Sequence, residues 1–307
     1  MHTIEARSLT KTYPGGIQAV KGVAFQVDPG EVFGLLGPNG AGKSTTVGML
    51  TTTIRPTTGQ ALVGGYDVVK QPLAARRVSS VVFQEPVVDR SLTGRANLEL
   101  HARLWGSGSG IRMREVTAAL GLSELIDRTV LSYSGGERRR LEIARALVSQ
   151  PAVLFLDEPT VGLDPRIRHE LLDVIAGLRG RGDLTILITT HYLDEAQRLA
   201  DRVAIIHEGE VVALDSPRAL LARLGGEILE FRVADDPHAA LAALRLKRLV
   251  GDDAFAVGAS VTVPLHGRAA ADVLAGLNAH ALEISTRIPS LDDVYLQLTG
   301  TELAAAA

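Results

Sequence analysis

The sequence predicts an α/β fold with a parallel core sheet and an antiparallel N-terminal sheet, followed by a small α+β domain. Three observations support this prediction. Continuous apolar runs, typical of parallel strands covered on both faces, alternate with helical patterns. Two stretches near the start alternate between apolar and polar residues instead. After residue 224, short strands and helices follow one another in a different order.

The strands expected in the antiparallel sheet and in the parallel core sheet differ in their hydrophobic patterns. Thr3–Thr10 and Val23–Asp28 have a period of two, which predicts antiparallel strands with one face exposed. The runs Glu31–Gly37, Val153–Asp157 and Leu184–Thr190 are apolar without alternation, so we expect buried parallel strands there.

Helices and a hairpin complete the first domain. Glu137–Ser149 and Arg166–Leu178 have helical patterns between the apolar runs. Val203–Ile206 and Glu210–Leu214 alternate on either side of a Glu-Gly turn, which predicts a hairpin.

A domain boundary is expected near Leu224–Glu227, where a helix ends in two glycines. This divides the chain into residues 1–224 and residues 225–307. The elements expected in the second part are strand Ile228–Val233, helix His238–Leu246, strands Ala254–Val257 and Ser260–Leu265, helix Arg268–Ala279 and strand Leu282–Arg287. This β-α-β-β-α-β order is the split βαβ arrangement of ferredoxin-like domains, and a last helix begins after Pro289.

Composition excludes several classes of protein. The 307 residues carry a net charge of −3, so no broad basic surface for nucleic acid is implied. The absence of cysteine excludes disulfide scaffolds, cysteine–zinc sites and thiol catalysis. No apolar run reaches the length of about 18 residues that a membrane helix needs, and the N-terminus lacks the apolar stretch of a secretory signal. We therefore expect a cytoplasmic protein.

A phosphate-binding loop follows the first apolar strand. The segment fits the pattern G-x-x-x-x-G-K-[ST] between a strand and a helix, with the residues Gly37, Pro38, Asn39, Gly40, Ala41, Gly42, Lys43, Ser44 and Thr45. Its glycines let backbone N–H groups converge on phosphate oxygens at a helix N-terminus. Lys43 is expected to reach the β- and γ-phosphates, and the Ser44 hydroxyl to bind Mg²⁺.

Two carboxylates end the strand Val153–Asp157. Asp157 is placed to hold Mg²⁺, and Glu158 to accept a proton from an attacking water or to orient it. The motif is weak alone, because many buried strands end in an acidic residue. Together with the phosphate loop it predicts a nucleotide–metal site.

A short glycine-containing segment directly precedes the helical run Arg138–Leu147. Its residues are Ser134, Gly135, Gly136 and Glu137. They are either a helix cap or an anion site made of a hydroxyl, glycine amides and the helix dipole. The arginines at Arg138–Arg140 are interpreted as a solvated face.

The segment Tyr133–Glu137 resembles the signature sequence of ATP-binding-cassette (ABC) ATPases, with Tyr for the family's Leu and Glu for its Gln. The family's other markers follow in order, with Tyr13 at the A-loop, Gln84 at the Q-loop, Asp164 at the D-loop and His191 at the switch histidine. The resemblance implies a P-loop NTPase fold with a parallel core sheet, an antiparallel subsheet and a helical subdomain.

The resemblance also implies residue roles. Tyr13 stacks on the adenine of ATP, Gln84 contacts the metal or water and faces a membrane partner, and His191 lies near the γ-phosphate. Two domains enclose two ATP molecules head to tail in a homodimer. Each nucleotide site then also includes Asp164 and the signature residues Ser134, Gly135 and Gly136. The signature acts in trans, on the nucleotide bound by the phosphate loop of the other subunit.

The C-terminal stretch Arg287–Gly300 and the segment Leu92–Leu98 resemble ATP-binding subunits of the daunorubicin-resistance type. This resemblance implies a separate ABC-2-type permease at the inner face of the cell membrane and export of a drug, lipid or hydrophobic metabolite. Residues 227–300 are expected to serve dimerisation or regulation, or to be a dimer-stabilising appendage only. The alternatives are an importer ATPase with a regulatory C-terminal domain, a soluble non-transport ABC ATPase acting on ribosomes or DNA, and a nucleotide-binding module without turnover.

Overall fold

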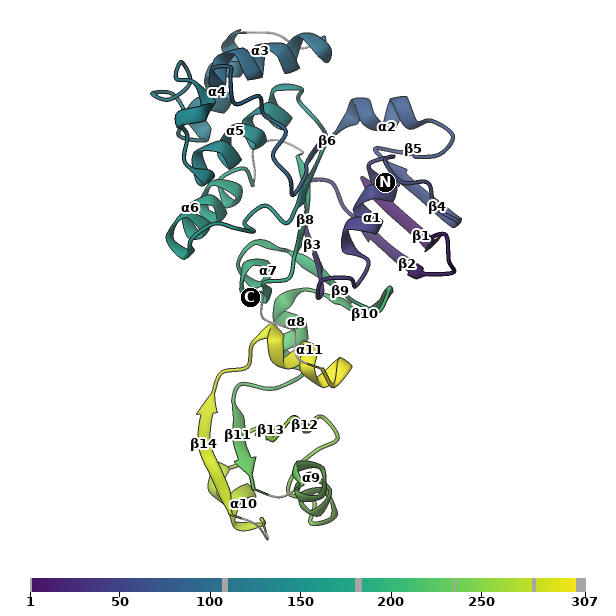
Figure 1. The fold of residues 1–307 in the computed structure, drawn as a ribbon. Helices are drawn as coiled ribbons and strands as arrows, with labels where there is room; N and C mark the ends of the chain where they lie inside the picture. Colours follow the sequence, from purple (N-terminus) through teal and green to yellow (C-terminus); the bar gives the residue numbers. More distant parts are fainter. Residues whose placement is uncertain (1, 107–109, 180–183, 235, 278–279, 302–307) are drawn as a thin grey trace. The chain divides into compact units, whose positions relative to one another are not determined.

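The computed structural model describes residues 2–106, 110–179, 184–234, 236–277 and 280–301 (Figure 1). The chain divides into two compact units. The N-terminal unit consists of Met1–His191 and Arg198–Leu214, and the C-terminal unit of Tyr192–Gln197 and Asp215–Ala307. The functional division at residue 224 stays a prediction. None of the helices among the described residues is long and apolar enough to cross a membrane.

The first sheet of the N-terminal unit is antiparallel, as predicted. Its order is β2-β1-β4-β5, with β1 at Ile4–Thr12, β2 at Gln18–Val27, β4 at Thr58–Val63 and β5 at Tyr66–Asp67. Side chains such as those of Ile4 and Val20 are fully buried in a core beneath it. The sequence analysis did not include β4 and β5.

The second sheet carries the site. Its order is β10-β9-β3-β8-β7-β6, with β10 at Glu210–Asp215, β9 at Arg202–His207, β3 at Val32–Leu36, β8 at Thr185–Thr190, β7 at Val153–Asp157 and β6 at Ser79–Val82. The pairs from β9 to β6 are parallel. Every residue of β3, β7 and β8 is buried, which confirms the prediction from continuous apolar runs.

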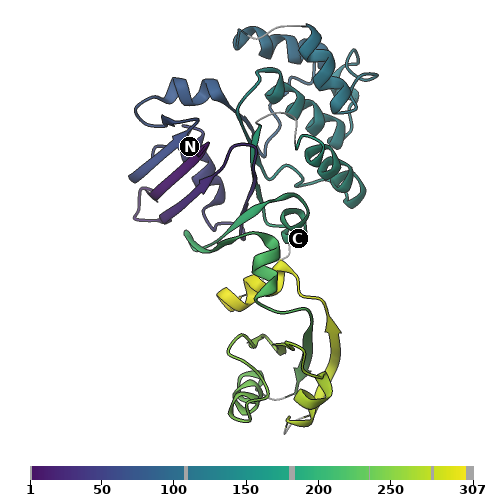
Figure 2. The same ribbon diagram turned by 180° about the vertical axis from the view of Figure 1, so that it is seen from behind.

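Helices α3 to α6 gather at the β6 side of this sheet in both views (Figures 1 and 2). Their bounds are α3 Gly94–Leu104, α4 Gly110–Ala119, α5 Gly135–Val148 and α6 Pro165–Ala176, with a short 3₁₀ turn η1 at Val130–Ser132. Helix α5 contacts α3, α4 and α6, and buried side chains such as Leu98 and Leu141 fill the space between them. The helical subdomain is therefore confirmed. Two further helices are α1 at Lys43–Leu50 and α2 at Pro72–Val78.

The C-terminal unit contains the predicted split βαβ arrangement. Its sheet has the order β12-β13-β11-β14, and the pairs are antiparallel. The elements are α7 Leu193–Leu199, α8 Pro217–Ala222, β11 Ile228–Val233, α9 Pro237–Leu246, β12 Phe255–Val257, β13 Ser260–Pro264, α10 Ala270–Ala275, β14 Ala281–Arg287 and α11 Leu291–Thr299. Helix α11 contacts α8, and the predicted helix after Pro289 is confirmed.

An ion-pair cluster lies where β14 leads into α11. Asp293 is fully buried and accepts two hydrogen bonds from Arg287, at 2.7 and 2.8 Å, and one from the backbone N–H of Ser290 at 2.8 Å. Arg287 also donates to Glu230 of β11 at 3.1 Å. These hydrogen bonds raise the pKa of the guanidinium above its usual range. The cluster fixes the start of α11 to the sheet.

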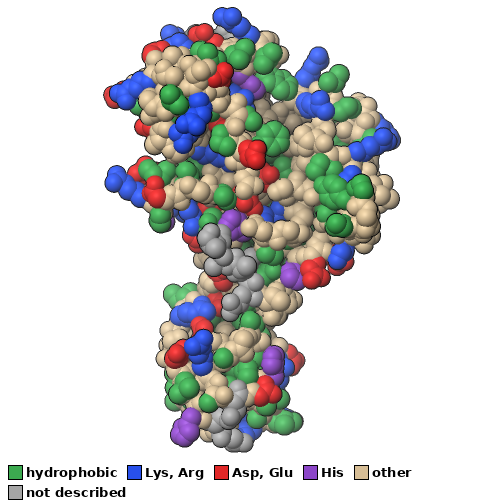
Figure 3. Space-filling model, in the orientation of Figure 1, with side chains coloured by type: hydrophobic (Ala, Val, Ile, Leu, Met, Phe, Trp, Pro, Cys, Tyr) green, Lys and Arg blue, Asp and Glu red, His purple; other side chains and the backbone are tan. Residues whose placement is uncertain are grey.

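Charged side chains of both signs are mixed on the face shown in Figure 3. This distribution agrees with a chain that carries 32 basic and 35 acidic residues.

Candidate functional site

The phosphate loop connects β3 to α1, as predicted, and two of its glycines are required by close backbone approaches. Gly37 has φ +154°, and a Cβ there would collide with the carbonyl oxygen of Ile206. Gly42 has φ +105°, and a Cβ there would collide with the carbonyl oxygen of Ala19. Helix α1 begins at the next residue, Lys43, so its free N–H groups point to the loop.

Lys43 is buried and holds an internal ion pair. Its Nζ donates to the carbonyl oxygens of Gly37 and Pro38, at 2.8 and 3.1 Å. It also lies 3.1 Å from Oε1 of Glu158, and the two side chains are only 3% and 7% exposed. An ammonium group can exchange these acceptors for phosphate oxygens, which also accept hydrogen bonds and, like the carboxylate, carry negative charge. The residues present therefore fit a nucleotide phosphate.

Ser44 and Asp157 bring two oxygens together. The Ser44 Oγ donates to Asp157 Oδ1 at 3.4 Å. Thr189 at the end of β8 also donates to Asp157 Oδ1, at 2.6 Å, because the register of β7 and β8 pairs these two residues. A hydroxyl beside a carboxylate fits Mg²⁺, which prefers a few protein oxygens together with substrate phosphates.

Glu158 is held in a strained conformation beside two basic groups. Its φ is +44°, in the left-handed region that non-glycine residues seldom adopt. Its backbone N–H donates to Thr189 Oγ1 at 2.9 Å. Its Oε2 lies 3.4 Å from Nδ1 of His191, while Oε1 contacts Lys43. Lys43, Glu158 and His191 therefore form one cluster.

Tyr13 lies at the phosphate loop. Its hydroxyl is 3.4 Å from Oγ1 of Thr45, and the Lys11 ammonium lies 5.2 Å from the centre of its ring. The half-buried ring is thus next to the start of α1. The stacking of this ring on adenine stays a prediction.

The signature residues form the cap of α5. Ser134 Oγ accepts from the Glu137 N–H at 3.2 Å, and Glu137 Oε2 accepts from the Ser134 N–H at 2.7 Å, which is a capping box. A Cβ on Gly136 would collide with Ile167 of α6. The carboxylate at position 137 therefore serves the cap within this chain.

Asp164 and Gln84 lie at the ends of other elements. Asp164 is exposed and caps α6 by accepting from the Ile167 N–H at 3.0 Å. Gln84 is exposed just after β6. Among the described residues, the hydrogen bonds and ion pairs of Lys43 and Glu158 involve neither of these two residues nor the signature residues. One chain therefore brings together only part of the predicted site residues.

The interpretation of Arg138–Arg140 as a solvated face was wrong for Arg139. This side chain is 8% exposed and donates to the backbone carbonyls that follow β7. Arg139 and Thr189 are the two site residues that the sequence analysis missed. A signal existed for each, because Arg139 is three residues from Gly136 on the buried side of α5, and Thr189 pairs with Asp157 at the carboxyl end of its strand.

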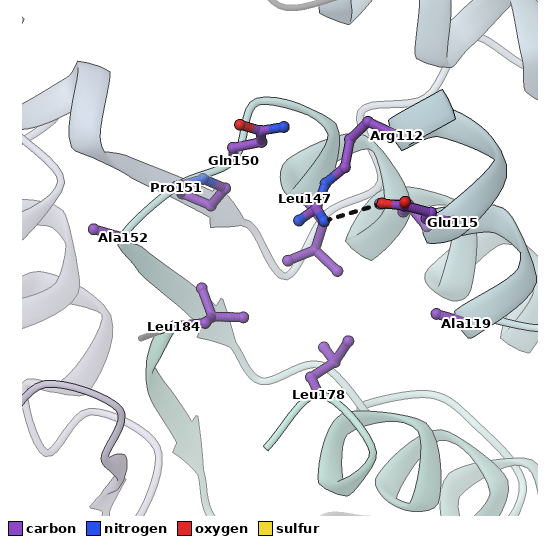
Figure 4. A pocket seen from close by; sticks show the side chains of 10 residues that line it. Arg112, Glu115, Ala119, Leu147, Gln150, Pro151, Ala152, Leu178 and Leu184 are labelled. Atoms are coloured by element: carbon purple, nitrogen blue, oxygen red, sulfur yellow. Dashed lines mark ion pairs between the residues drawn. The ribbon is translucent and has the colours of Figure 1, made fainter. Parts of the chain in front are cut away.

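A cavity in the N-terminal unit lies away from this site. It has a volume of about 550 Å³ and is lined by residues such as Glu115, Leu147 and Leu178 (Figure 4). Ala152 and Leu184, which also line it, precede β7 and β8, whereas Asp157 ends β7. The cavity therefore lies at the opposite end of these strands.

A glycine loop on a parallel sheet, a buried lysine and a hydroxyl–carboxylate pair at the strand ends define a P-loop nucleotide-binding protein. The ABC transporter family model matches residues 20–161. The chain is 43% identical over 307 residues to the daunorubicin/doxorubicin resistance ATP-binding protein DrrA of Streptomyces peucetius, covering 97% of this chain and 92% of that protein. It is 37% identical over 318 residues to the Nod factor export ATP-binding protein I of Rhizobium etli, covering 99% and 95%.

The chain is also similar to solved structures of ATP-binding cassettes. One is cbiO1 from Clostridium perfringens, part of the ABC transporter complex cbiONQ, with a TM-score of 0.66, 28% identity and coverage of 72% of this chain and 91% of that one. Another is the dimeric post-hydrolysis state of the ATP-binding cassette MJ0796 with ADP and Pi, with a TM-score of 0.62, 27% identity and coverage of 69% and 98%. The chain belongs to the ABC transporter family, and it is an ATPase of that family.

Proposed function

We propose that this chain is the ATP-hydrolysing subunit of an exporter, which dimerises around two ATP molecules and drives a separate ABC-2-type permease. The observation that carries the proposal is the cluster of Lys43, Glu158 and His191 beside Ser44 and Asp157, in a chain similar over nearly its full length to resistance and export ATP-binding proteins. The cargo class is a drug, a lipid or a hydrophobic metabolite.

The residues act on ATP by position and charge. Loop amides and Lys43 bind the phosphates, and Tyr13 stacks on the adenine. Ser44 and Asp157, with Gln84, hold Mg²⁺, which neutralises charge on the phosphates when bound. Glu158 accepts the proton of the attacking water, and the nearby His191 orients the reacting groups.

A second copy completes the site. Ser134, Gly135 and Gly136 of the partner subunit contact the γ-phosphate side of the nucleotide, and Asp164 lies at the junction. Two observations support this. One chain brings together only part of the predicted site residues, and the similar ATP-binding cassette MJ0796 is dimeric. The C-terminal domain, residues 225–307, serves dimerisation or regulation.

Replacing Glu158 by Gln tests the catalytic assignment. The variant keeps the size of the side chain and loses the proton acceptor, so we expect retained ATP binding, turnover reduced at least about 100-fold and a trapped dimer. Steady-state ATPase assays and size-exclusion chromatography with ATP measure this. Glu170→Gln, on the exposed side of α6, is the control and should behave as wild type. A Glu158→Gln chain that hydrolyses ATP at the wild-type rate would refute the assignment.

The permease contact is proposed at the segment after β6 and the end of α3. Leu100, Leu104 and Trp105 are 52%, 76% and 38% exposed, which is unusual for apolar side chains on one short helix. The amide of Asn97 on the same helix donates to the carbonyl oxygen of Asp89, at 2.9 Å, and so ties this helix to the segment that contains Gln84. Trp105 also lines one pocket with Phe83, the residue before Gln84, which supports a contact surface near the Q-loop. Through this surface the chain would sit at the inner face of the membrane.

An affinity pull-down from gently solubilised native membranes tests this contact. We expect one multi-span protein near a one-to-one ratio, and we expect Leu104→Glu to lose it. Leu246→Glu, which changes a similarly exposed leucine on α9, should retain it. Recovery of an additional substrate-binding protein would instead indicate an importer. Recovery of ribosomal or DNA-repair proteins would refute the transport function and leave the ATPase intact.

A further inference from the structure

We infer that Arg139 and Glu142 form a positioning pair that fixes the Q-loop segment 83–87 against the catalytic turn 157–159. The pair would thereby set where Gln84 lies relative to Glu158. The inference rests on the proposed function and adds to it two residues to which neither the family markers nor the sequence pattern assigned a role.

The guanidinium of Arg139 uses all of its five N–H donors inside the protein. Towards the catalytic turn, it donates to the carbonyl oxygens of Pro159, Asp157 and Glu158, at 2.8, 3.2 and 3.3 Å. Towards the Q-loop, it donates to the carbonyl oxygen of Phe83 at 2.6 Å. One side chain on α5 therefore holds both segments at once.

The fifth donor connects Arg139 to Glu142, one helical turn along α5. Their Nη1 and Oε2 atoms are 2.8 Å apart, and the side chains are 8% and 2% exposed. The other carboxylate oxygen of Glu142 accepts from the backbone N–H of Val87 at 2.9 Å. The pair thus holds the Q-loop segment at two points, Phe83 and Val87, on either side of the exposed Gln84.

These contacts require the planar guanidinium group of arginine, whose N–H donors point in several directions. A lysine carries the same charge but has three donors at one point, so it cannot reach two segments in opposite directions. Because both charges are buried, removing one alone leaves the other uncompensated, whereas removing both together does not. We therefore test the pair with the double variant Arg139→Gln/Glu142→Gln, which removes both buried charges together. A second variant, Arg139→Lys, keeps the charge and removes the planar guanidinium.

We expect the double variant to fold, to bind ATP within about twofold of wild type and to hydrolyse it with kcat about 10- to 100-fold lower. ATP binding is retained because the hydrogen bonds of these two residues described above involve neither the phosphate loop nor Tyr13. Hydrogen exchange of the double variant should become faster at the amides of Gln84, Glu85, Val87 and Val88 and at those of Glu158, Thr160 and Val161. It should stay unchanged at amides 141–147 of α5. Arg139→Lys should show the same pattern.

The matched control is Arg140→Gln, which removes the neighbouring arginine of the same helix and should give wild-type kcat and exchange. Wild-type kcat in the double variant, or faster exchange spread evenly over α5, would overturn the inference. If the wild-type chain itself hydrolyses no ATP, the proposed function fails, while the exchange pattern still decides whether the pair fixes the two segments.

Discussion

Thr189 contacts both acidic residues of the proposed site, the side chain of Asp157 and the backbone of Glu158. Its fully buried hydroxyl donates to Asp157 Oδ1 at 2.6 Å and accepts from the N–H of Glu158 at 2.9 Å. Replacing it with Val keeps a β-branched side chain of similar size in β8 and removes only these two hydrogen bonds. Thr189→Ser keeps the hydroxyl and is the matched control.

The cost of Thr189→Val follows from the two lost bonds. A hydrogen bond to a charged group contributes about 1.5–3 kcal/mol, and a buried N–H left unsatisfied costs about 1–3 kcal/mol. Asp157 keeps its contact with Ser44, so we take the lower half of each range and expect about 3 kcal/mol. With a urea m-value of about 3 kcal/mol/M, the midpoint of unfolding should fall by roughly 1 M. Turnover should fall too, because Glu158 loses the bond that holds its left-handed backbone.

The fluorescence of Trp105 reports this unfolding, since it is the only tryptophan of the chain and lies at the end of α3 in the N-terminal unit. Urea titrations and steady-state ATPase rates should be measured for wild type and both variants. The reasoning would be refuted by a Thr189→Val midpoint within about 0.2 M of wild type, or by equal effects of Val and Ser.

Two further predictions concern other parts of the chain. Burial, with a smaller effect of Arg145, lowers the pKa of His101 from 6.5 to about 4, so its stabilising effect is complete above pH 6.5 and is lost as the pH falls towards 4. The wild-type protein should therefore lose about 1–2 kcal/mol more stability than His101→Gln over this range, after allowance for partial exposure, and parallel urea curves at both pH values would contradict this. Asp293→Asn should destabilise the C-terminal unit by about 2 kcal/mol, because Arg287 loses a charged partner and one of the two acceptor oxygens and keeps its ion pair with Glu230. Hydrogen exchange at α11 measures it, and unchanged protection would show that the ion pair is dispensable.

The sequence predicted the parts of the fold whose signals are local. The phosphate loop lies within one short stretch, so its spacing alone located Lys43 and Ser44. Buried strands such as β7 were found because parallel strands covered on both faces are apolar throughout. The strand β4 was missed, since it contains Gly59 and polar residues and shows no clear period.

Residues whose role depends on tertiary partners were harder to predict. Arg139 stands among three arginines, and only its position on the buried side of α5 distinguishes it from Arg140. The clustering of His191 with Glu158 depended on the order of strands in the sheet, which places β8 beside β7. The trans role of Ser134 stays a prediction, because it concerns a second copy of the chain.

The ion pair between Lys43 and Glu158 makes the carboxylate of Glu158, our proposed base, a competitor of the nucleotide phosphates. Any phosphate that binds the Lys43 ammonium must displace a carboxylate already 3.1 Å away in a buried site. Phosphate and carboxylate therefore compete for one cation, so that breaking this ion pair offsets part of the free energy of ATP binding. Neutralising the carboxylate would tighten nucleotide binding as well as stop turnover, so a trapped complex of Glu158→Gln would owe its long life to both effects.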